Sequence, residues 1–179
     1  MPTFRVRVNP HNSLETLAQY HVASVGEKIE SRNYDRIGLD CASAIIAMAF
    51  AVEAILNFVG AKRVPGWNER ASFAKKVAAL QSRFRFSLDG QVEPYKTVLL
   101  LKKARDTMAH GQPIELEVRV ESDRQIGRSM QPSWAAVATP EFVISAYQQV
   151  NEFKSFLFTR ARIKAGASFT SASAVECET

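Results

Sequence analysis

The sequence predicts a mainly α-helical protein: an antiparallel helical bundle of about five helices, with a β-hairpin inserted before the last helix. Two patterns support this prediction. Apolar residues recur every three or four positions through most of the chain, between short polar or glycine-containing turns, and only one stretch alternates with period two. The 179 residues, 46% of them hydrophobic, suit one globular domain and exclude a largely disordered or collagen-like chain.

The chain is expected to begin with an extended arm, residues 1–11, which leads into a helical bundle over residues 12–165. The first helix, residues 12–31, has Asn12 as its cap and Glu15 three residues later. In this pattern the two side chains satisfy free backbone amides at the start of a helix.

The second helix, residues 40–60, begins with Asp40 as a cap and ends where Gly60 permits a helix stop. It is almost entirely apolar and long enough to span a membrane. Glu53 and Asn57 interrupt the apolar run, and no second span follows. We therefore expect a helix buried at the centre of the bundle and no membrane association.

Two further helices precede the change of pattern. Residues 68–84 carry an apolar stripe at helical spacing, and residues 93–110 form a helix that Pro94 starts and Gly111 stops.

A β-hairpin is expected over residues 113–138, because apolar and charged residues alternate there and a second β-like run covers residues 134–138. The alternating apolar residues are Ile114, Leu116, Val118 and Val120. Thr139 and the proline after it start the last long helix. Residues 166–179 are small and rich in serine and alanine, so we expect a disordered tail.

The charge is concentrated in one segment. The formal net charge is +5 and the pI about 9.4, and residues 62–85 alone carry +6. The basic residues of this segment are Lys62, Arg63, Arg70, Lys75, Lys76, Arg83 and Arg85. Such a stretch is usually a solvated helix face, and its functional interpretation is contact with a nucleic-acid backbone.

The cysteines and histidines do not form a metal-binding pattern. Cys41 and Cys177 make no CxxC pair, and the three histidines lack the spacing that places two ligands on one face. We expect no metal and no other cofactor. The N-terminus lacks the apolar core of a signal peptide, so we expect a cytoplasmic protein.

The fourth helix contains a residue that a plain bundle does not need. Its apolar stripe consists of Pro94, Val98, Leu101, Arg105 and Met108. Because a guanidinium stays charged and is costly to bury alone, an anion must lie opposite Arg105. The anion is a carboxylate of the protein, a phosphate of a ligand, or both in turn. Glu53 is the simplest carboxylate, and Asn57, one turn further on, shares its helix face.

His110 follows Arg105 by five residues, about 140° around an unbroken helix. Gly111 permits the chain to leave the helix there and to bring the imidazole toward Arg105. Asp106 lies between them and can orient either side chain. An arginine that stabilises a phosphorane and a histidine that transfers protons are the minimum parts for cleaving RNA without a metal.

Residues 105–111, Arg-Asp-Thr-Met-Ala-His-Gly, resemble the Arg-polar-x3-His signature of the HEPN superfamily, which ends a helix of a helical bundle. The second helix, through Glu53 and Asn57, is similar to the acidic, largely apolar helix beside the motif in many HEPN proteins. The resemblance covers the helical scaffold, residues 12–160 without the hairpin. Asp106 stands where the family more often has asparagine.

This resemblance implies a metal-independent endoribonuclease acting on single-stranded RNA, often a toxin or defence factor, with two motifs meeting across a homodimer. It implies that Arg105 binds the scissile phosphate and that His110 is the acid/base, with Asp106 beside them. Glu53 and Asn57 would support Arg105 from behind. The residues expected to contact RNA are Lys102, Lys75, Lys76, Arg83 and Arg85. A cognate antitoxin or another protein is a further expected partner.

Two alternatives remain open. In the first, the chain is a non-catalytic HEPN-like module that binds a nucleotide, a protein partner or its own copy, and Arg105 pairs permanently with Glu53. In the second, it is a structural phage or assembly protein, an interpretation that rests on the inserted hairpin and the serine- and alanine-rich tail.

Overall fold

The structure, a computed structural model, describes residues 3–113 and 130–175 and the single positions 115, 117, 119 and 126. Five α-helices make up most of this part of the chain: α1 (Pro10–Glu30), α2 (Ile37–Arg63), α3 (Phe73–Phe84), α4 (Tyr95–His110) and α6 (Pro140–Ala161). Two strands, β1 (Thr3–Arg7) and β2 (Ser171–Val175), and two 3-10 helices, η1 (Ser133–Ala136) and η2 (Ala165–Ser168), complete it. The mainly helical, five-helix bundle expected from the sequence is confirmed.

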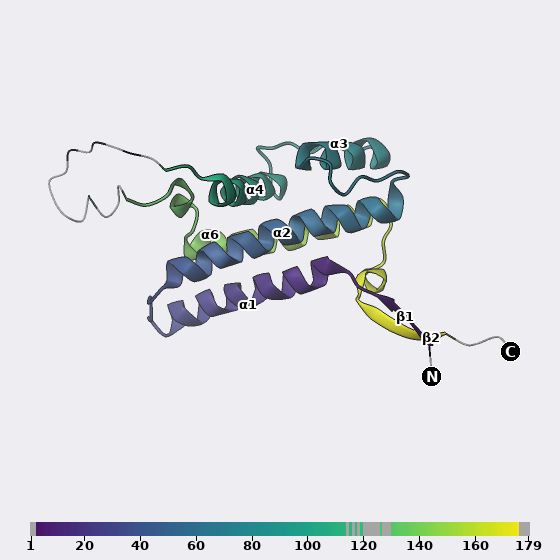
Figure 1. The fold of residues 1–179 in the computed structure, drawn as a ribbon, viewed down its shortest axis with the longest axis horizontal. Helices are drawn as coiled ribbons and strands as arrows, with labels where there is room; N and C mark the ends of the chain where they lie inside the picture. The colour runs from purple at the N-terminus through teal and green to yellow at the C-terminus, as the bar shows by residue number, and fades with distance from the viewer. Residues whose placement is uncertain are drawn as a thin grey trace.

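α2 is the central helix and contacts each of the other four α-helices. In Figure 1, α1 lies on one side of α2, α3 and α4 lie on the other, and α6 lies behind it. α1 runs antiparallel to α2, whereas α6 runs in the same direction as α2. By length and composition α2 can cross a membrane, but most of its apolar residues are buried within the bundle, as in the core helix of a globular domain.

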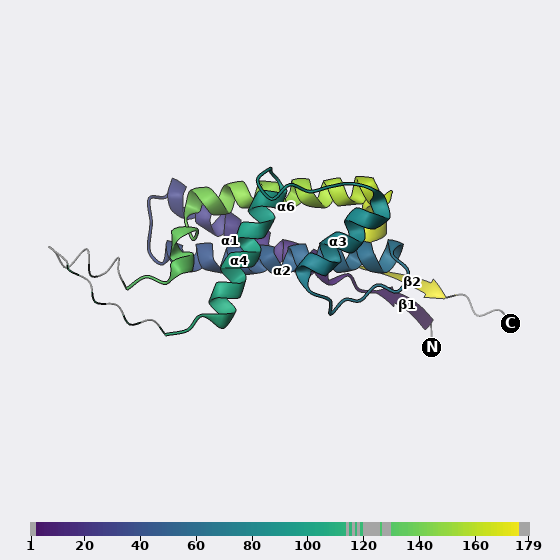
Figure 2. The ribbon, with the colours of Figure 1, turned by 90° about the horizontal axis from the view of Figure 1, so that it is seen from above.

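α4 crosses the bundle steeply. Figure 2 shows α1, α2 and α6 running along the long axis of the molecule, with α4 laid across them. Val98, Leu101 and Ala104 of α4 are buried against the core. The crossing brings the second half of α4 over α2, where the polar residues Glu53 and Arg105 meet.

The prediction that residues 134–138 form the second strand of a hairpin is wrong. Residues 134–138 lie in the 3-10 helix η1 and the turn after it, because their backbone amides bond locally: Ala135 N–H donates to the Pro132 carbonyl and Val137 N–H to that of Trp134. The four apolar residues of the expected first strand lie outside the described residues. In the described part of the chain, the only sheet pairs β1 with β2, antiparallel, with Arg7 opposite Ser171.

The expectation of a disordered tail is wrong as far as Val175, where the described residues end. Two asparagines of the opposite terminus hold this segment in place. The Asn9 side-chain amide donates to the Ser168 carbonyl at 2.8 Å, and that of Asn12 donates to the same carbonyl at 2.9 Å. Asn12 therefore does not cap α1, which begins two residues earlier at Pro10.

Gly60 does not end α2 as expected, since the helix continues to Arg63. A Cβ atom at Gly60 would lie 2.2 Å from the ring of Trp67, far inside van der Waals contact. Trp67 therefore packs directly on the backbone of α2, and Gly60 permits that close approach.

Candidate functional site

Arg105 contacts the carboxylate that the sequence required. Its Nη2 lies 2.9 Å from Oε2 of Glu53 on α2, and its Nη1 lies 3.2 Å from Oδ1 of Asp106. The guanidinium carbon also lies over the ring of Phe50, 5.6 Å from the centroid. The pairing of Arg105 with Glu53 is thus confirmed, and the side chain is 22% exposed.

Glu53 also binds a second cation that the sequence analysis missed. The Lys76 ammonium donates to Oε1 of Glu53 at 2.7 Å, and the Lys76 side chain is only 1% exposed. The expected contact of Lys76 with RNA is therefore wrong, because this residue is buried beneath α3. Its position was a usable signal: Lys76 lies three residues after Phe73 and four before Leu80, on the buried stripe of α3.

These contacts form one ionic cluster that joins three helices. Asp106 accepts a hydrogen bond from Lys102, one turn earlier on α4. The cluster consists of Lys76, Glu53, Arg105, Asp106 and Lys102. It runs from the buried side of α3 to the surface of α4 and contains one more cation than carboxylate. Because Lys76 is buried, the carboxylate of Glu53 is indispensable to it.

His110 does not lie beside Arg105. Gly111 has a φ of −58°, outside the left-handed region, so α4 continues through His110 and the imidazole stays on a different side of the helix. The expected return of His110 toward Arg105 is therefore wrong. Gly111 is needed for space, because a Cβ atom there would lie 2.8 Å from the Thr107 carbonyl oxygen.

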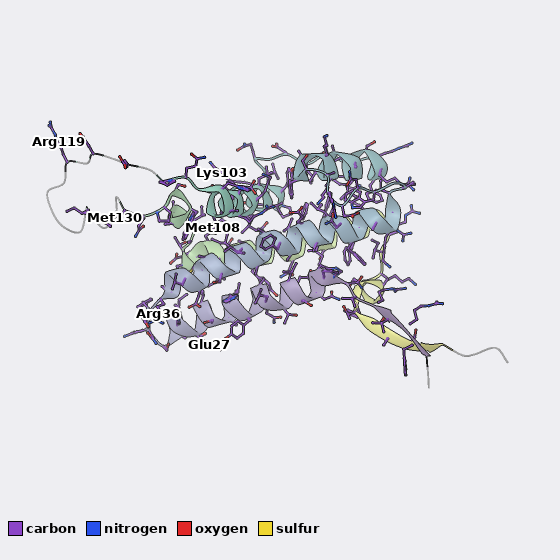
Figure 3. All side chains as sticks on the ribbon, viewed as in Figure 1. Glu27, Arg36, Lys103, Met108, Arg119 and Met130 are labelled. Carbon is purple, nitrogen blue, oxygen red and sulfur yellow. The ribbon has the colours of Figure 1, made fainter. Side chains whose placement is uncertain are left out.

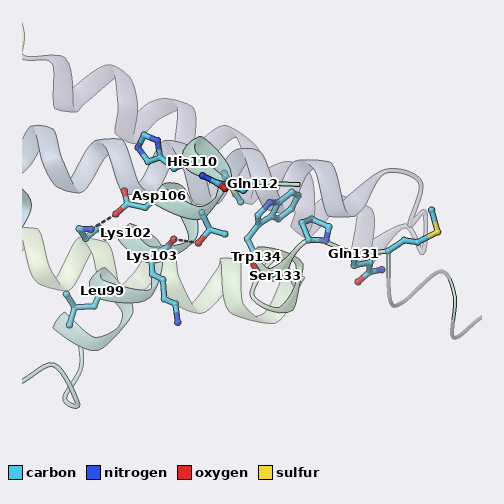
Figure 4. A pocket seen from close by; sticks show the side chains of 14 residues that line it. Leu99, Lys102, Lys103, Asp106, His110, Gln112, Gln131, Ser133 and Trp134 are labelled. Carbon is cyan, nitrogen blue, oxygen red and sulfur yellow. Dashed lines mark hydrogen bonds and ion pairs between the residues drawn. The ribbon is translucent and has the colours of Figure 1, made fainter. Parts of the chain in front are cut away.

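The exposed imidazole of His110 instead borders a hollow of about 840 Å³ between the end of α4 and the η1 segment. Its polar and aromatic lining includes His110, Asp106, Lys102, Lys103, Gln112 and Trp134. Figure 4 shows Lys102, Asp106 and His110 projecting from successive turns of α4, with Trp134 near Gln112. Lys103, Met108 and Met130, which also line it, lie on the same side of the bundle in Figure 3.

This lining suits a phosphate ester that carries an aromatic base. The Lys103 ammonium forms no ion pair among the described residues and is available for negative charge, whereas that of Lys102 is paired with Asp106. An imidazole is available for proton transfer, and an indole offers a stacking surface. Asp106 belongs to both the hollow and the ionic cluster, so it connects His110's surroundings to Arg105.

The remaining expected site residues lie elsewhere. The side-chain oxygen of Asn57 has no hydrogen-bond partner within the described residues, and Asn57 lines a different hollow together with Arg7 and Asn9. Its expected support of Arg105 is therefore wrong. Lys75 is exposed on α3, and Arg83 and Arg85 are exposed at the end of that helix.

Two other reactive residue types are buried. Burial raises the pKa of the Cys41 thiol to about 11, so it stays protonated at neutral pH and is a poor nucleophile. Burial lowers the pKa of His11, whose ring is fully buried 4.6 Å from that of Phe58. Within the residues that the structure describes, no group of three or more His, Cys, Asp or Glu side chains is placed to hold a metal ion.

No family model matches this chain, and neither a curated protein nor a solved structure is significantly similar to it. Its function must therefore be inferred from its own side chains.

Proposed function

We propose that this protein is a HEPN-like endoribonuclease that cleaves single-stranded RNA in the hollow around His110. One observation carries the proposal: an exposed histidine at the end of α4 borders a hollow of about 840 Å³ that also contains two lysines and a tryptophan. The imidazole supplies acid/base chemistry, the Lys103 ammonium offsets phosphate charge, and the indole stacks on a base.

In the proposed reaction the 2′-oxygen of a ribose attacks the adjacent phosphorus and the 5′-oxygen of the next nucleotide leaves. The proton of the 2′-hydroxyl passes to an imidazole, and the leaving oxygen receives a proton from an imidazolium. The products are a 2′,3′-cyclic phosphate and a 5′-hydroxyl. Lys103 stabilises the extra negative charge on the phosphorane, since the Lys102 ammonium is already paired with Asp106.

A homodimer would supply two histidines for these two proton transfers. Its proposed interface is the exposed apolar stripe of α2 beside Arg105: Leu39, Ile46 and Phe50 are 65%, 37% and 42% exposed. Their spacing of seven and four residues places them on one helix face. In sedimentation velocity, the wild type is expected to be dimeric and Leu39→Asp/Ile46→Asp monomeric. A monomeric wild type would contradict this arrangement.

The reaction is tested by incubating purified protein with end-labelled single-stranded RNA in EDTA. The expected products end in 2′,3′-cyclic phosphate, and DNA of the same sequence stays intact because it lacks the 2′-hydroxyl. A wild type that leaves RNA uncut, or that cuts DNA equally, would refute the proposed reaction.

A second candidate is the non-catalytic module, favoured by the two carboxylates that hold Arg105. Here Arg105→Ala and Glu53→Ala lose stability, and strong coupling between them in a double-mutant cycle accompanies a complete lack of cleavage. A role as a toxin or defence factor, a cognate antitoxin and a cytoplasmic location remain predictions.

A further inference from the structure

A strongly basic surface lies where three helices end, away from the His110 hollow. Lys62 and Arg63 end α2, Arg83 lies in the last turn of α3, and Arg162 and Lys164 follow α6. We name these five residues the basic end. Figures 1 and 2 show α2, α3 and α6 ending at the same side of the molecule, from which β1 and β2 project.

The basic end is held in place by hydrogen bonds to the backbone. Arg83 Nε donates to the Arg63 carbonyl at 2.9 Å, and Arg63 Nη2 donates to the Arg162 carbonyl at 2.8 Å. Each of these arginines therefore caps a helix end with part of its guanidinium and keeps its other N–H groups available.

The charge exceeds what helix capping requires. Three helix C-termini carry roughly −0.5 each, about −1.5 together. The five cations therefore leave an excess of about +3.5. Among the described residues, none of the five forms an ion pair with a carboxylate. An external polyanion is the natural partner of such an excess.

The surface is also hollowed and carries an exposed aromatic ring. Lys62, Arg63, Arg162 and Lys164 line a hollow of about 420 Å³. A neighbouring hollow of about 560 Å³ shares Arg162 and Lys164 and includes Phe169, which is 61% exposed. Cations that follow a backbone beside an aromatic ring that stacks on a base are typical of single-stranded nucleic-acid binding.

We propose that the basic end binds the phosphate backbone of single-stranded RNA, with Phe169 stacking on a base. Lys62 lies nine residues beyond Glu53 on α2, about 14 Å at 1.5 Å per residue, so this surface is separate from the ionic cluster. RNA that crosses both surfaces would be anchored at one and cut at the other. The choice of RNA as the polyanion rests on the proposed function.

Binding is measured separately from cleavage. The probe is fluorescein-labelled 20-nucleotide polyuridine, titrated by anisotropy at several salt concentrations against full-length protein carrying His110→Asn to prevent cutting. Lys62→Gln/Lys164→Gln in that background is expected to weaken binding about tenfold at 0.1 M salt. The slope of log affinity against log salt should fall by about 1.4, for two lost phosphate contacts.

The matched control is Lys96→Gln/Arg32→Gln, which removes the same charge from exposed positions on α4 and after α1. It should bind as the parent does, and thermal melts verify that all variants fold. Equal affinities and slopes for the two double variants would overturn the proposal. The proposal would also be overturned if Lys62→Gln/Lys164→Gln lost binding to phosphatidylserine vesicles but still bound polyuridine like its parent. The partner of the basic end would then be a lipid surface.

The two proposals fail in different ways. Wild type that binds polyuridine through the basic end but leaves RNA uncut would refute the nuclease and support the binding surface. Wild type that cuts RNA while Lys62→Gln/Lys164→Gln binds like its control would support the nuclease and refute the binding surface.

Discussion

Two halves of one motif lie in contrasting surroundings. Arg105 is 22% exposed and sits between Glu53 and Asp106, in a cluster that extends to the buried Lys76. His110, five residues later, is exposed and borders an open hollow. The difference shows that neighbouring positions of a short motif can lie in separate environments, one holding helices together and the other bordering an open hollow.

The largest expected change in the free energy of unfolding comes from the ionic cluster around Arg105, which we call the closed side. Glu53→Ala removes the carboxylate that neutralises Lys76, leaving a buried ammonium unpaired, and should cost about 3–5 kcal/mol in the free energy of unfolding. His110→Ala, on the open side, should change it by no more than about 0.5 kcal/mol. Urea denaturation of both variants measures the two changes in the free energy of unfolding. Equal losses of stability would contradict this difference between Glu53 and His110.

The glycines provide a second contrast between closed and open positions. Gly60→Ala drives a Cβ atom into Trp67 and should destabilise the protein by about 1–3 kcal/mol, although alanine favours helix. Gly26→Ala, in α1, meets no atom within 4 Å and should stabilise the protein by up to about 1 kcal/mol. Thermal melts compare them. Stabilisation by Gly60→Ala would mean that Trp67 does not pack on α2.

The smallest expected effect is a pH dependence of the free energy of unfolding, caused by the buried histidine His11. Because burial lowers the pKa of His11 below 6.5, the unfolded chain takes up a proton that the folded chain does not. The free energy of unfolding should therefore fall as the pH drops below about 6.5, by at most about 1.4 kcal/mol per pH unit. Nearby Glu15 and Lys154, which pair at 2.7 Å, oppose each other's influence on this pKa.

Urea titrations between pH 7.5 and 5.5 test this dependence. His11→Phe should flatten it, because the lowered pKa of His11 is its cause. A wild type whose stability does not change over this range would show that His11 is not held neutral in the folded state.

The helices were predictable because their apolar stripes are local in sequence. The carboxylate partner of Arg105 was predictable because this arginine interrupts such a stripe. Lys76 was missed because a charged residue next to Lys75 resembles a solvated face, although its spacing from Phe73 and Leu80 marks it as buried. The final strand was missed for another reason. β2 depends on β1 and on Asn9, more than 150 residues away, and no local pattern encodes that pairing.

The hollow around His110 also lay beyond local pattern. Trp134 was expected on a strand, and only the short 3-10 helix η1 brings it to the end of α4. Spacing identified the histidine as a candidate acid/base, but the other wall of the hollow, residues 130–134, comes from a segment twenty or more residues further along the chain.

We propose that His110 carries out acid/base chemistry in the open hollow and does not hold the fold together. Single-turnover cleavage of labelled RNA in EDTA, with a thermal melt on the same preparations, tests it for wild type and His110→Asn. We predict a fall in cleavage rate of at least about 100-fold with the melting temperature unchanged. Cleavage by His110→Asn at the wild-type rate would contradict the claim.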